Sequence, residues 1–521
     1  MMRRTPTLLY IPACIAAAGI LVPLFYLVLR SAEAEGPVIA SLILRRNTFV
    51  LLSNTLLLAS GVLLSSLAIS LPLAWITERT SIRGRKVISL LGVIPLAVPG
   101  YVMAYALLSI GGNYGLSARL LGTSVPRISG YWGAVLALTL YCYPYLYLNI
   151  RTALAGLDPA LEETAGSLGY SPVNIFFRVI LPHLRSALLA GSMIIVLYVL
   201  GDFGVVALMR YEVFSYAIYT QYTGAFDRTY AALLSLILVT ISMVFLISEF
   251  LLIRKVRTAR IGSGSQRRHH RSSLSIFSLA AYVFVVTLAG LSVLLPIASL
   301  LLWMRHASPW HVLPRVLQSF LRSAGAAGPA AVMAVSLALP ISYLHIRYPG
   351  RLSRLSERSA YIGYAIPPLT LGLAFVFFSI RAIPGWYQTL PILVAAYGLN
   401  FLALAMGPVR SSLLHLPRRI EEAARSLGCS MPRVITGITI PLLSRGILAS
   451  LALVFVMAMK ELPIALLLSP PGFTTLSMAV FSRTSEALFA EAAPFAAAII
   501  LLSTIVVGVL LHYEGSSDAP A

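Results

Sequence analysis

The sequence predicts an all-α, polytopic membrane protein with about twelve transmembrane helices, arranged as two parallel six-helix repeats. The chain is 58% hydrophobic and only 11% charged, whereas a soluble domain averages roughly 25% charged residues. It contains apolar runs long enough to cross a bilayer. It also carries one polar segment twice, at a constant offset of 259 residues, which indicates an internal duplication.

A spanning helix needs about 20 mostly apolar residues, and twelve runs meet this requirement. In the first half they are 8–29, 50–76, 87–110, 131–150, 186–208 and 230–253. In the second half they are 275–303, 323–346, 360–380, 389–406, 446–468 and 493–511. The first run follows a basic start as in a signal peptide, but its length favours an uncleaved spanning helix.

The basic residues fit membrane topology better than nucleic-acid binding, although the net charge is +21. With the N-terminus and both copies of the polar segment on one side, 26 of the 39 Lys and Arg residues fall there and 12 on the other. The more basic side is the cytoplasm. We therefore expect a multi-pass protein of the cell membrane, with lipid as its solvent, no nucleic-acid partner, and both termini cytoplasmic.

The repeats are predicted at 1–253 and 274–521, and the segment 254–273 between them is predicted to be a basic cytoplasmic linker. Each repeat holds an even number of spans, so both have the same orientation. His269 and His270 fall in the linker and lack further ligands, which favours a solvated segment over a metal site. Pro99 and Pro367 lie inside the third and ninth spans and predict kinks there.

The duplicated segment covers 157–189 and 416–448. Its second copy contains signals for two short helices outside the membrane. Pro417 suits a first helical turn, and Gly428 suits the left-handed residue that ends a helix. Ser430 is an expected N-cap, and Pro441 is expected to break the second helix.

The spacing Glu-Ala-Ala, three residues, Gly, nine residues, Ile-x-Leu-Pro resembles the signature loop of ABC-importer permeases. The second copy departs only at Ile440, and the first departs at Thr164 and Val179. The residues that carry the resemblance, with the glutamates that precede them, are Glu162, Glu163, Ala165, Gly169, Pro182, Glu421, Glu422, Ala423, Ala424, Gly428 and Pro441.

This resemblance implies a type I ABC-importer permease fold. It implies that each loop docks, as a coupling helix, on one of two copies of a cytoplasmic ABC ATPase that binds ATP and Mg. An extracytoplasmic substrate-binding protein is the other implied partner. Glu163 and Glu422 are expected to pair with basic groups or helix N–H groups of the ATPase, while Gly169 and Gly428 allow the turn.

Within this class, the run from Lys460 to Pro463 followed by Leu467 and Leu468 resembles the fused ferric-iron permeases. The run Asp202-Phe203-Gly204 is its first-half counterpart. Thiamine and aminophosphonate permeases share the fused plan, and polyamine permeases share the loops. These substrates remain alternatives to iron.

Three charged residues lie within apolar surroundings: Asp202, Lys460 and Glu461. Asp202 and Glu461 are again 259 residues apart, and a charge at a helix centre costs about 2.5–3.5 kcal/mol on insertion scales. One explanation is structural, with Lys460 or backbone N–H groups near Pro463 neutralising a carboxylate. The other is that both carboxylates line a pathway or gate and contact a cation.

The sequence contains no catalytic motif. The lysines Lys86, Lys255 and Lys460 do not follow glycine, so the chain lacks a phosphate-binding loop, and Cys14, Cys142 and Cys429 show no metal-ligand spacing. We therefore expect no enzyme activity and no cofactor in this chain. A secondary transporter driven by an ion gradient, with the buried charges as its relay, remains the alternative class.

Overall fold

The structure, a computed structural model, describes residues 9–33, 35–113, 115–224, 227–255, 277–306 and 309–515. In these ranges seven helices are long and apolar enough to cross a membrane. Five further pairs of helices pass the same test together but bend by more than 40° at a short break. Counting each bent pair as one span gives twelve spans, which agrees with the number predicted from hydrophobicity.

The first half begins with the single span α1 and ends with the single span α14. Its helices are α1 (Tyr10–Ala32), α2 (Gly36–Ile43), α3 (Arg46–Arg79), α4 (Arg85–Leu91), the 3-10 turn η2 (Ile94–Ala97), α5 (Gly100–Ile110), α6 (Leu116–Leu121), α7 (Gly130–Ala155), α8 (Pro159–Ser167), α9 (Pro172–Ile175), the π-helical turn η3 (Phe176–Ile180), α10 (Leu181–His183), α11 (Arg185–Gly201), α12 (Gly204–Leu208), α13 (Phe214–Thr223) and α14 (Arg228–Lys255).

The second half repeats this order. Its helices are α15 (Ser278–Ala289), the π-helical turn η5 (Gly290–Leu294), α16 (Leu295–Met304), α17 (Pro309–Arg347), α18 (Arg351–Ala365), α19 (Pro368–Ala382), the 3-10 turn η6 (Pro384–Trp386), α20 (Leu390–Asn400), α21 (Leu402–His415), α22 (Arg418–Ser426), α23 (Met431–Val434), the π-helical turn η7 (Ile435–Thr439), α24 (Ile440–Leu442), α25 (Ser444–Lys460), α26 (Pro463–Leu468), α27 (Leu476–Ser485) and α28 (Phe489–Gly515). Apart from the end of α14, the predicted linker 254–273 lies outside the described residues.

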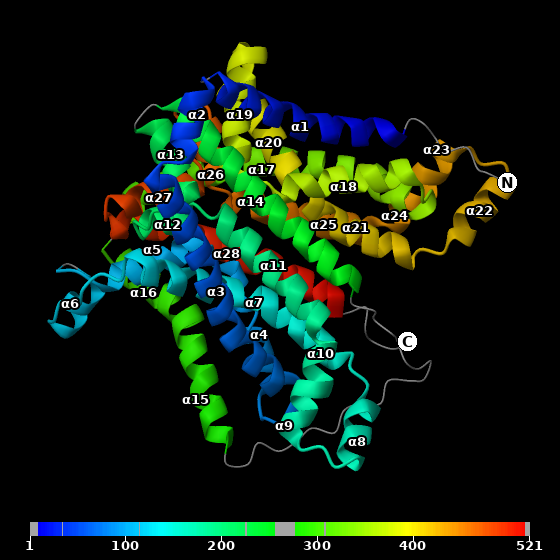
Figure 1. The fold of residues 1–521 in the computed structure, drawn as a ribbon, viewed down its shortest axis with the longest axis horizontal. Helices are drawn as coiled ribbons and strands as arrows, with labels where there is room; N and C mark the ends of the chain where they lie inside the picture. Colours follow the sequence, from blue (N-terminus) through cyan, green and yellow to red (C-terminus); the bar gives the residue numbers. More distant parts are fainter. Residues whose placement is uncertain are drawn as a thin grey trace.

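The first span of each half packs against the other half. Helix α1 lies along α17, α18 and α19 (Figure 1), and the rings of Tyr26 and Phe378 meet edge to face at 5.4 Å. Helix α16 packs on α5, where Ser109 Oγ and Ser299 Oγ are 2.6 Å apart. The sequence repeat is therefore not a closed spatial unit, because each half needs a helix from its neighbour to complete its packing.

The third and ninth spans break at their prolines. The two arms meet at 93° before Gly100 and at 102° before Pro368, which is a larger bend than a proline kink. Pro99 and Pro367 are both extended, with ψ of 150° and 134°, and each supplies no N–H to continue the helix. The break turns the helices α5 and α19 into the interior, where 10 of the 11 residues of α5 and 10 of the 15 residues of α19 are buried.

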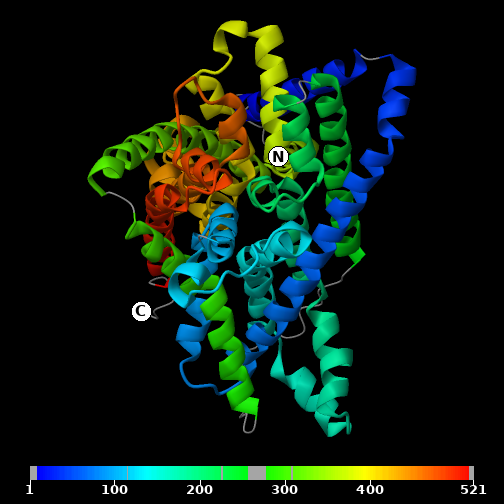
Figure 2. The same ribbon diagram turned by 90° about the vertical axis from the view of Figure 1, so that its left-hand side faces the viewer.

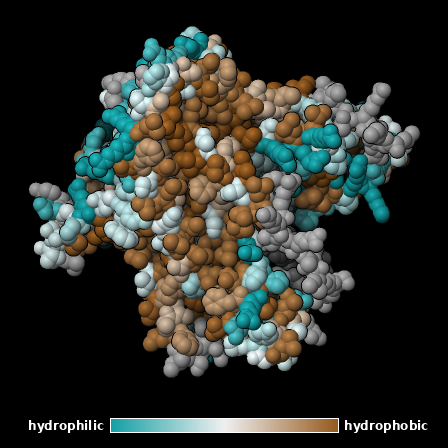
Figure 3. Space-filling view, viewed as in Figure 1, coloured by the Kyte–Doolittle hydropathy of each residue, from teal (hydrophilic) through white to brown (hydrophobic). Residues whose placement is uncertain are grey.

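The two copies of the duplicated segment lie at separate extremities of the molecule. Figure 1 shows α8 and α9 at the lower end and α22 and α23 at the right-hand end. Figure 2 shows α15 extending from the same end of the first half as the α8–α9 region. A broad hydrophobic surface covers the face between these extremities, and hydrophilic residues gather around its ends (Figure 3). That surface fits the hydrocarbon core of a bilayer.

Candidate functional site: the coupling segments and the central cavity

Each duplicated segment forms a pair of short helices joined at a left-handed glycine. Gly169 follows α8 with φ +83°, and Gly428 follows α22 with φ +86°. Side-chain-bearing residues rarely adopt this conformation, so the turn requires glycine in both copies. The predicted stop residues are therefore confirmed as backbone features.

Three predicted details of the second copy differ in the structure. Pro417 lies at the N-cap of α22 rather than in its first turn. Ser430 occupies the N-cap of α23 but its side chain makes no cap hydrogen bond, whereas Ser171 accepts one from the Asn174 N–H at 3.4 Å. Pro441 does not break the helix, since the π-helical turn η7 widens the coil ahead of it. The chain bends by 70° only after Leu442, at the start of α25.

A buried ion pair fixes α22 to the end of α17. Arg347 Nε lies 3.0 Å from Glu421 Oε2, and the two side chains are only 7% and 8% exposed. The Thr439 hydroxyl donates to Glu421 Oε1 at 3.0 Å, and Arg347 also donates to the Leu416 carbonyl at 3.0 Å. The carboxylate and guanidinium are thus both paired and hydrogen-bonded, which is the condition for burying charges.

The same pair recurs in the first half. Arg79 Nη2 lies 2.9 Å from Glu162 Oε1 and donates to the Leu154 carbonyl at 3.3 Å. Burial raises the pKa of the Glu162 carboxyl above its usual value, and the Arg79 charge opposes that shift. Glu162 therefore attaches α8 to the end of α3, and Glu421 attaches α22 to the end of α17, the equivalent span of the second half. Sequence reasoning missed both arginines, because they read only as cytoplasmic positive charges.

The opposite face of each coupling helix is open to solvent. Glu163 is exposed, and Glu422 is 42% exposed with Arg418 at 3.4 Å. Ala165 and Ala424 are buried against the short helices that follow, while Ala423 and Pro182 are exposed. Two leucines that sequence reasoning did not single out, Leu168 and Leu427, are 73% and 86% exposed at equivalent positions. These two exposed leucines lie on the segments for which the sequence predicts a docking role.

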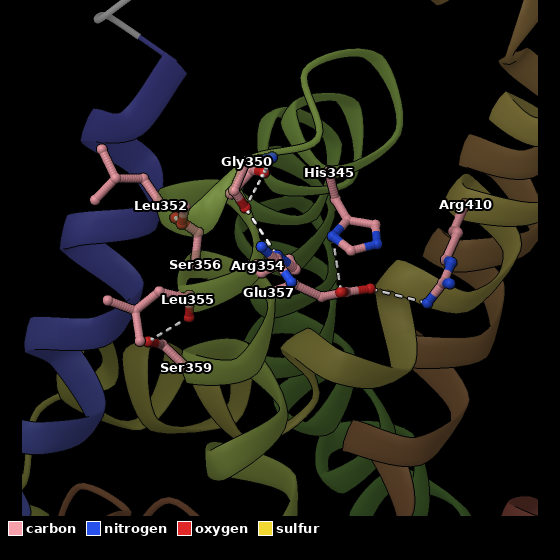
Figure 4. Close-up of polar contacts among 10 residues, drawn as sticks. His345, Gly350, Leu352, Arg354, Leu355, Ser356, Glu357, Ser359 and Arg410 are labelled. Carbon is pink, nitrogen blue, oxygen red and sulfur yellow. Dashed lines mark hydrogen bonds and ion pairs between the residues drawn. The ribbon is translucent and has the colours of Figure 1, made fainter. Parts of the chain in front are cut away.

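A second ion cluster joins α17, α18 and α21 (Figure 4). Glu357 of α18 lies between His345 Nδ1 at 2.9 Å and Arg410 Nη1 at 2.8 Å. In the first half, Arg151 is the counterpart of Arg410 and pairs with Glu78 at 2.8 Å. These two equivalent arginines therefore pair with carboxylates from non-equivalent helices, α3 in the first half and α18 in the second.

Glu357→Gln is expected to lower the melting temperature of the detergent-solubilised protein slightly. The substitution removes the charge that joins α17, α18 and α21, and a partly exposed pair contributes about 0.2–1 kcal/mol. Thermal unfolding should show a shift of a few degrees at most, with Glu486→Gln, an exposed carboxylate elsewhere, as the control. A shift no larger than that of the control would contradict a stabilising role.

Asp202 and Glu461 lie at the far ends of α11 and α25, each a 17-residue helix that starts beside a coupling segment. At 1.5 Å per residue, each carboxylate is about 25 Å from that start. Asp202 Oδ1 accepts from the Val205 N–H at 2.9 Å, and both Glu461 carboxylate oxygens accept from the Ile464 N–H at 3.3 Å. Both carboxylates thus receive backbone N–H groups at the start of the next short helix, α12 or α26.

The residues directly after these carboxylates close the space between the halves. Phe203 and Leu462 are equivalent and only 1% and 2% exposed. Phe203 packs on Phe481 of the other half, with ring centroids 5.3 Å apart. A Cβ at Gly204 would meet Leu462 Cδ2 at 3.1 Å, so the halves approach closely here. This packing is an apolar seal on the side remote from the coupling helices.

Lys460 bonds across the halves but not to a carboxylate. Its ammonium donates to the Leu96 carbonyl at 3.1 Å, at the break between η2 and α5. The carboxylates are therefore stabilised by backbone N–H groups, as one of the two structural explanations predicts. The other explanation, that Lys460 neutralises a carboxylate, is wrong, because Lys460 donates to a backbone carbonyl. Pro463 is the first residue of α26, where its missing N–H is no loss.

Together these features define a membrane transport protein of two fused helical repeats, with a cavity between the repeats and a segment of short helices at one extremity of each repeat. The chain belongs to the family of binding-protein-dependent transport system inner membrane components, whose model matches residues 70–258 and 330–514. It is therefore the multi-pass permease subunit of an importer of that family.

Relatives of this family cover the whole chain or one repeat. The Fe(3+)-transport system permease protein FbpB 2 of Haemophilus influenzae is 30% identical over 98% of this chain and 99% of its own length. The ferric transport system permease protein FbpB of Actinobacillus pleuropneumoniae is 21% identical over 89% of this chain and 70% of its own. The molybdenum transport system permease protein ModB of Escherichia coli is 30% identical over 39% of this chain and 91% of its own, which is a single-repeat match.

Proposed function

We propose that this chain is the permease of a ferric-iron importer and is driven by two copies of a separate cytoplasmic ATPase, which holds the ATP and Mg that this chain lacks. One ATPase docks on α8–α9 and the other on α22–α23. The observation that carries the proposal is the repeated attachment of these helices through Arg79–Glu162 and Arg347–Glu421, because a rigid link is what transmits force from a docked partner.

The choice of iron rests on the full-length similarity to a fused Fe(3+) permease and on the carboxylates in the cavity. The orientation rests on the charge distribution and on α1, whose start packs beside the attachment of α22. Leu9 contacts the cluster formed by Tyr343, Val409, Leu413 and Leu443. The N-terminal end of α1 thus lies on the coupling side, the proposed cytoplasmic side, and the receptor that delivers iron binds the opposite face.

Uptake of radioactive iron into proteoliposomes tests this proposal. The vesicles contain the permease with its ATPase inside, and receptor loaded with ferric iron is added outside. Uptake should require ATP and receptor together, and thiamine or molybdate should not compete. Iron uptake by the permease alone under a proton or sodium gradient would overturn the proposal in favour of a secondary transporter.

A further inference from the structure

The cavity between the halves has two chemically different walls. It has a volume of about 160 Å³ and is lined by residues of both repeats around Asp202 and Glu461. All six pairs of lining residues that are 259 residues apart differ between the halves, and in three of them a hydroxyl or charged group is gained or lost. With the first-half residue given first, these three are Tyr141 and Asn400, Tyr198 and Met457, and Gly201 and Lys460.

The first-half wall gathers hard oxygen donors. The Tyr141 and Tyr198 rings lie 4.7 Å apart, tilted at 39° to each other. A Cβ placed on Gly100 would meet the Tyr198 hydroxyl at 3.5 Å and Asp202 Oδ2 at 3.6 Å. The Tyr198 hydroxyl and the Asp202 oxygen that does not cap α12 therefore face the same small space.

A third first-half tyrosine, Tyr101, contributes a buried hydroxyl that lacks a partner among the described residues. Tyr101 lines the cavity and is 6% exposed. Leaving a buried polar group unpaired costs about 1–3 kcal/mol, so this oxygen is available to a ligand that enters the cavity.

We propose that the cavity is a transit site for the ferric ion. The carboxylates of Asp202 and Glu461 and the phenolic oxygens of Tyr198 and Tyr101 contact the cation as it passes between the halves. This inference rests on the proposed function. Carboxylate and phenol oxygens are hard donors that suit a small trivalent cation.

The site is built for passage rather than retention. No group of three or more His, Cys, Asp or Glu that could hold a metal occurs among the residues described. Lys460 places a positive charge on the second-half wall, where it repels the cation. A pathway needs binding that is strong enough for entry and weak enough for exit. The Asp202 carboxylate on the first-half wall attracts the cation, and Lys460 beside Glu461 weakens the attraction of the second-half wall.

Terbium binding to the permease in nanodiscs tests the site without transport. Tb³⁺ is a hard trivalent probe whose emission is sensitised by nearby excited tyrosine. The double variant Asp202→Asn, Glu461→Gln keeps an acceptor oxygen for each backbone N–H but removes both charges. We expect its Tb³⁺ affinity to fall about tenfold or more, which is 1.4 kcal/mol or more.

Two further variants change the site in opposite directions. Tyr198→Phe removes one oxygen without altering the fold, and we expect a smaller loss of affinity and of sensitised emission. Lys460→Met removes the cation from the second-half wall, and we expect tighter Tb³⁺ binding. The exposed carboxylate variant Glu486→Gln should bind Tb³⁺ as the parent does, and each variant should still co-purify with the ATPase, which reports a folded protein.

Equal Tb³⁺ affinity in the parent and the double amide variant would overturn the transit site, as would a loss of the same size in Glu486→Gln. If the double amide variant binds Tb³⁺ as the parent does and also imports iron normally, the proposed importer function is upheld and only the transit site is wrong. If the parent imports no iron while a Tb³⁺ site at Asp202 and Glu461 is measured, the site stands and the assignment of iron fails.

Discussion

Changing Leu168 and Leu427 to aspartate together is expected to abolish binding of the ATPase. The two leucines are 73% and 86% exposed and directly precede the left-handed glycines, so they project from the end of each coupling helix. Burying a leucine side chain in a contact contributes about 1.5–3 kcal/mol. Losing two, with a charge placed in each apolar contact, corresponds to at least about a 100-fold weaker association.

The measurement is co-purification of the ATPase with the tagged permease, followed by a titration of binding in nanodiscs. The matched control is Leu168→Met, Leu427→Met, which keeps the apolar contact and should retain the ATPase. Since both leucines lie in solvent, the aspartate variant should still insert and fold. Parent-like affinity in that variant would show that the ATPase binds elsewhere.

Reversing Arg347 to glutamate is expected to uncouple ATP hydrolysis from iron uptake. Arg347 and Glu421 are almost completely buried, and breaking such a pair by losing one partner costs about 3–5 kcal/mol. The variant would leave two carboxylates facing each other beside Thr439. Helix α22 then loses its attachment to α17, and movement of the docked ATPase no longer reaches the span.

Iron uptake per ATP hydrolysed, measured in proteoliposomes, reports this uncoupling. The swapped variant Arg347→Glu, Glu421→Arg should recover part of the coupling, because the pair is restored with its charges exchanged. Arg354→Glu is the control, since Arg354 is an exposed arginine of α18 outside the docking helices and such surface substitutions usually change stability by no more than about 0.5 kcal/mol. Equal uptake per ATP in Arg347→Glu and Arg354→Glu would contradict the attachment role.

The sequence predicted the features that depend on local chemistry. Hydrophobic runs gave twelve spans, and Pro99 and Pro367 marked the two sharp breaks, because a missing N–H acts where it occurs in the chain. Gly169 and Gly428 marked left-handed turns for the same kind of reason. The constant offset predicted two repeats, and the family match covers both.

Features that depend on tertiary contact were not predictable. The exchange of α1 and α16 between halves was hidden because a lipid-facing and a helix-facing apolar surface have the same composition. Glu162 and Glu421 appeared equivalent to their neighbours Glu163 and Glu422, yet only the first of each pair meets a buried arginine of a spanning helix. Pro441 was wrong as a helix break, because the π-helical turn before it depends on packing.

The cavity shows the same division. Asp202 and Glu461 stood out in the sequence as charges in apolar surroundings, and the structure brings both to one space between the halves. Tyr141 belongs to a cluster of tyrosines in the fourth span, which the sequence favours as a membrane-edge belt or packing, and Tyr198 was not singled out. Their place beside Asp202 depends on the packing of α7 against α11, which no local pattern encodes.

In the proposed function, the partner ATPases move α8–α9 and α22–α23 relative to each other, and this movement separates the packed residues Phe203 and Leu462 between the halves. The most direct test is the distance between spin labels at Phe177 and Thr436, two exposed and equivalent positions next to the coupling helices, measured in the assembled complex. Binding of ATP with Mg to a hydrolysis-deficient ATPase should shorten that distance, and the Leu168→Asp, Leu427→Asp variant should show no change. If the distance in the parent complex is the same with and without ATP, ATP binding does not move these two segments and the proposed coupling is wrong.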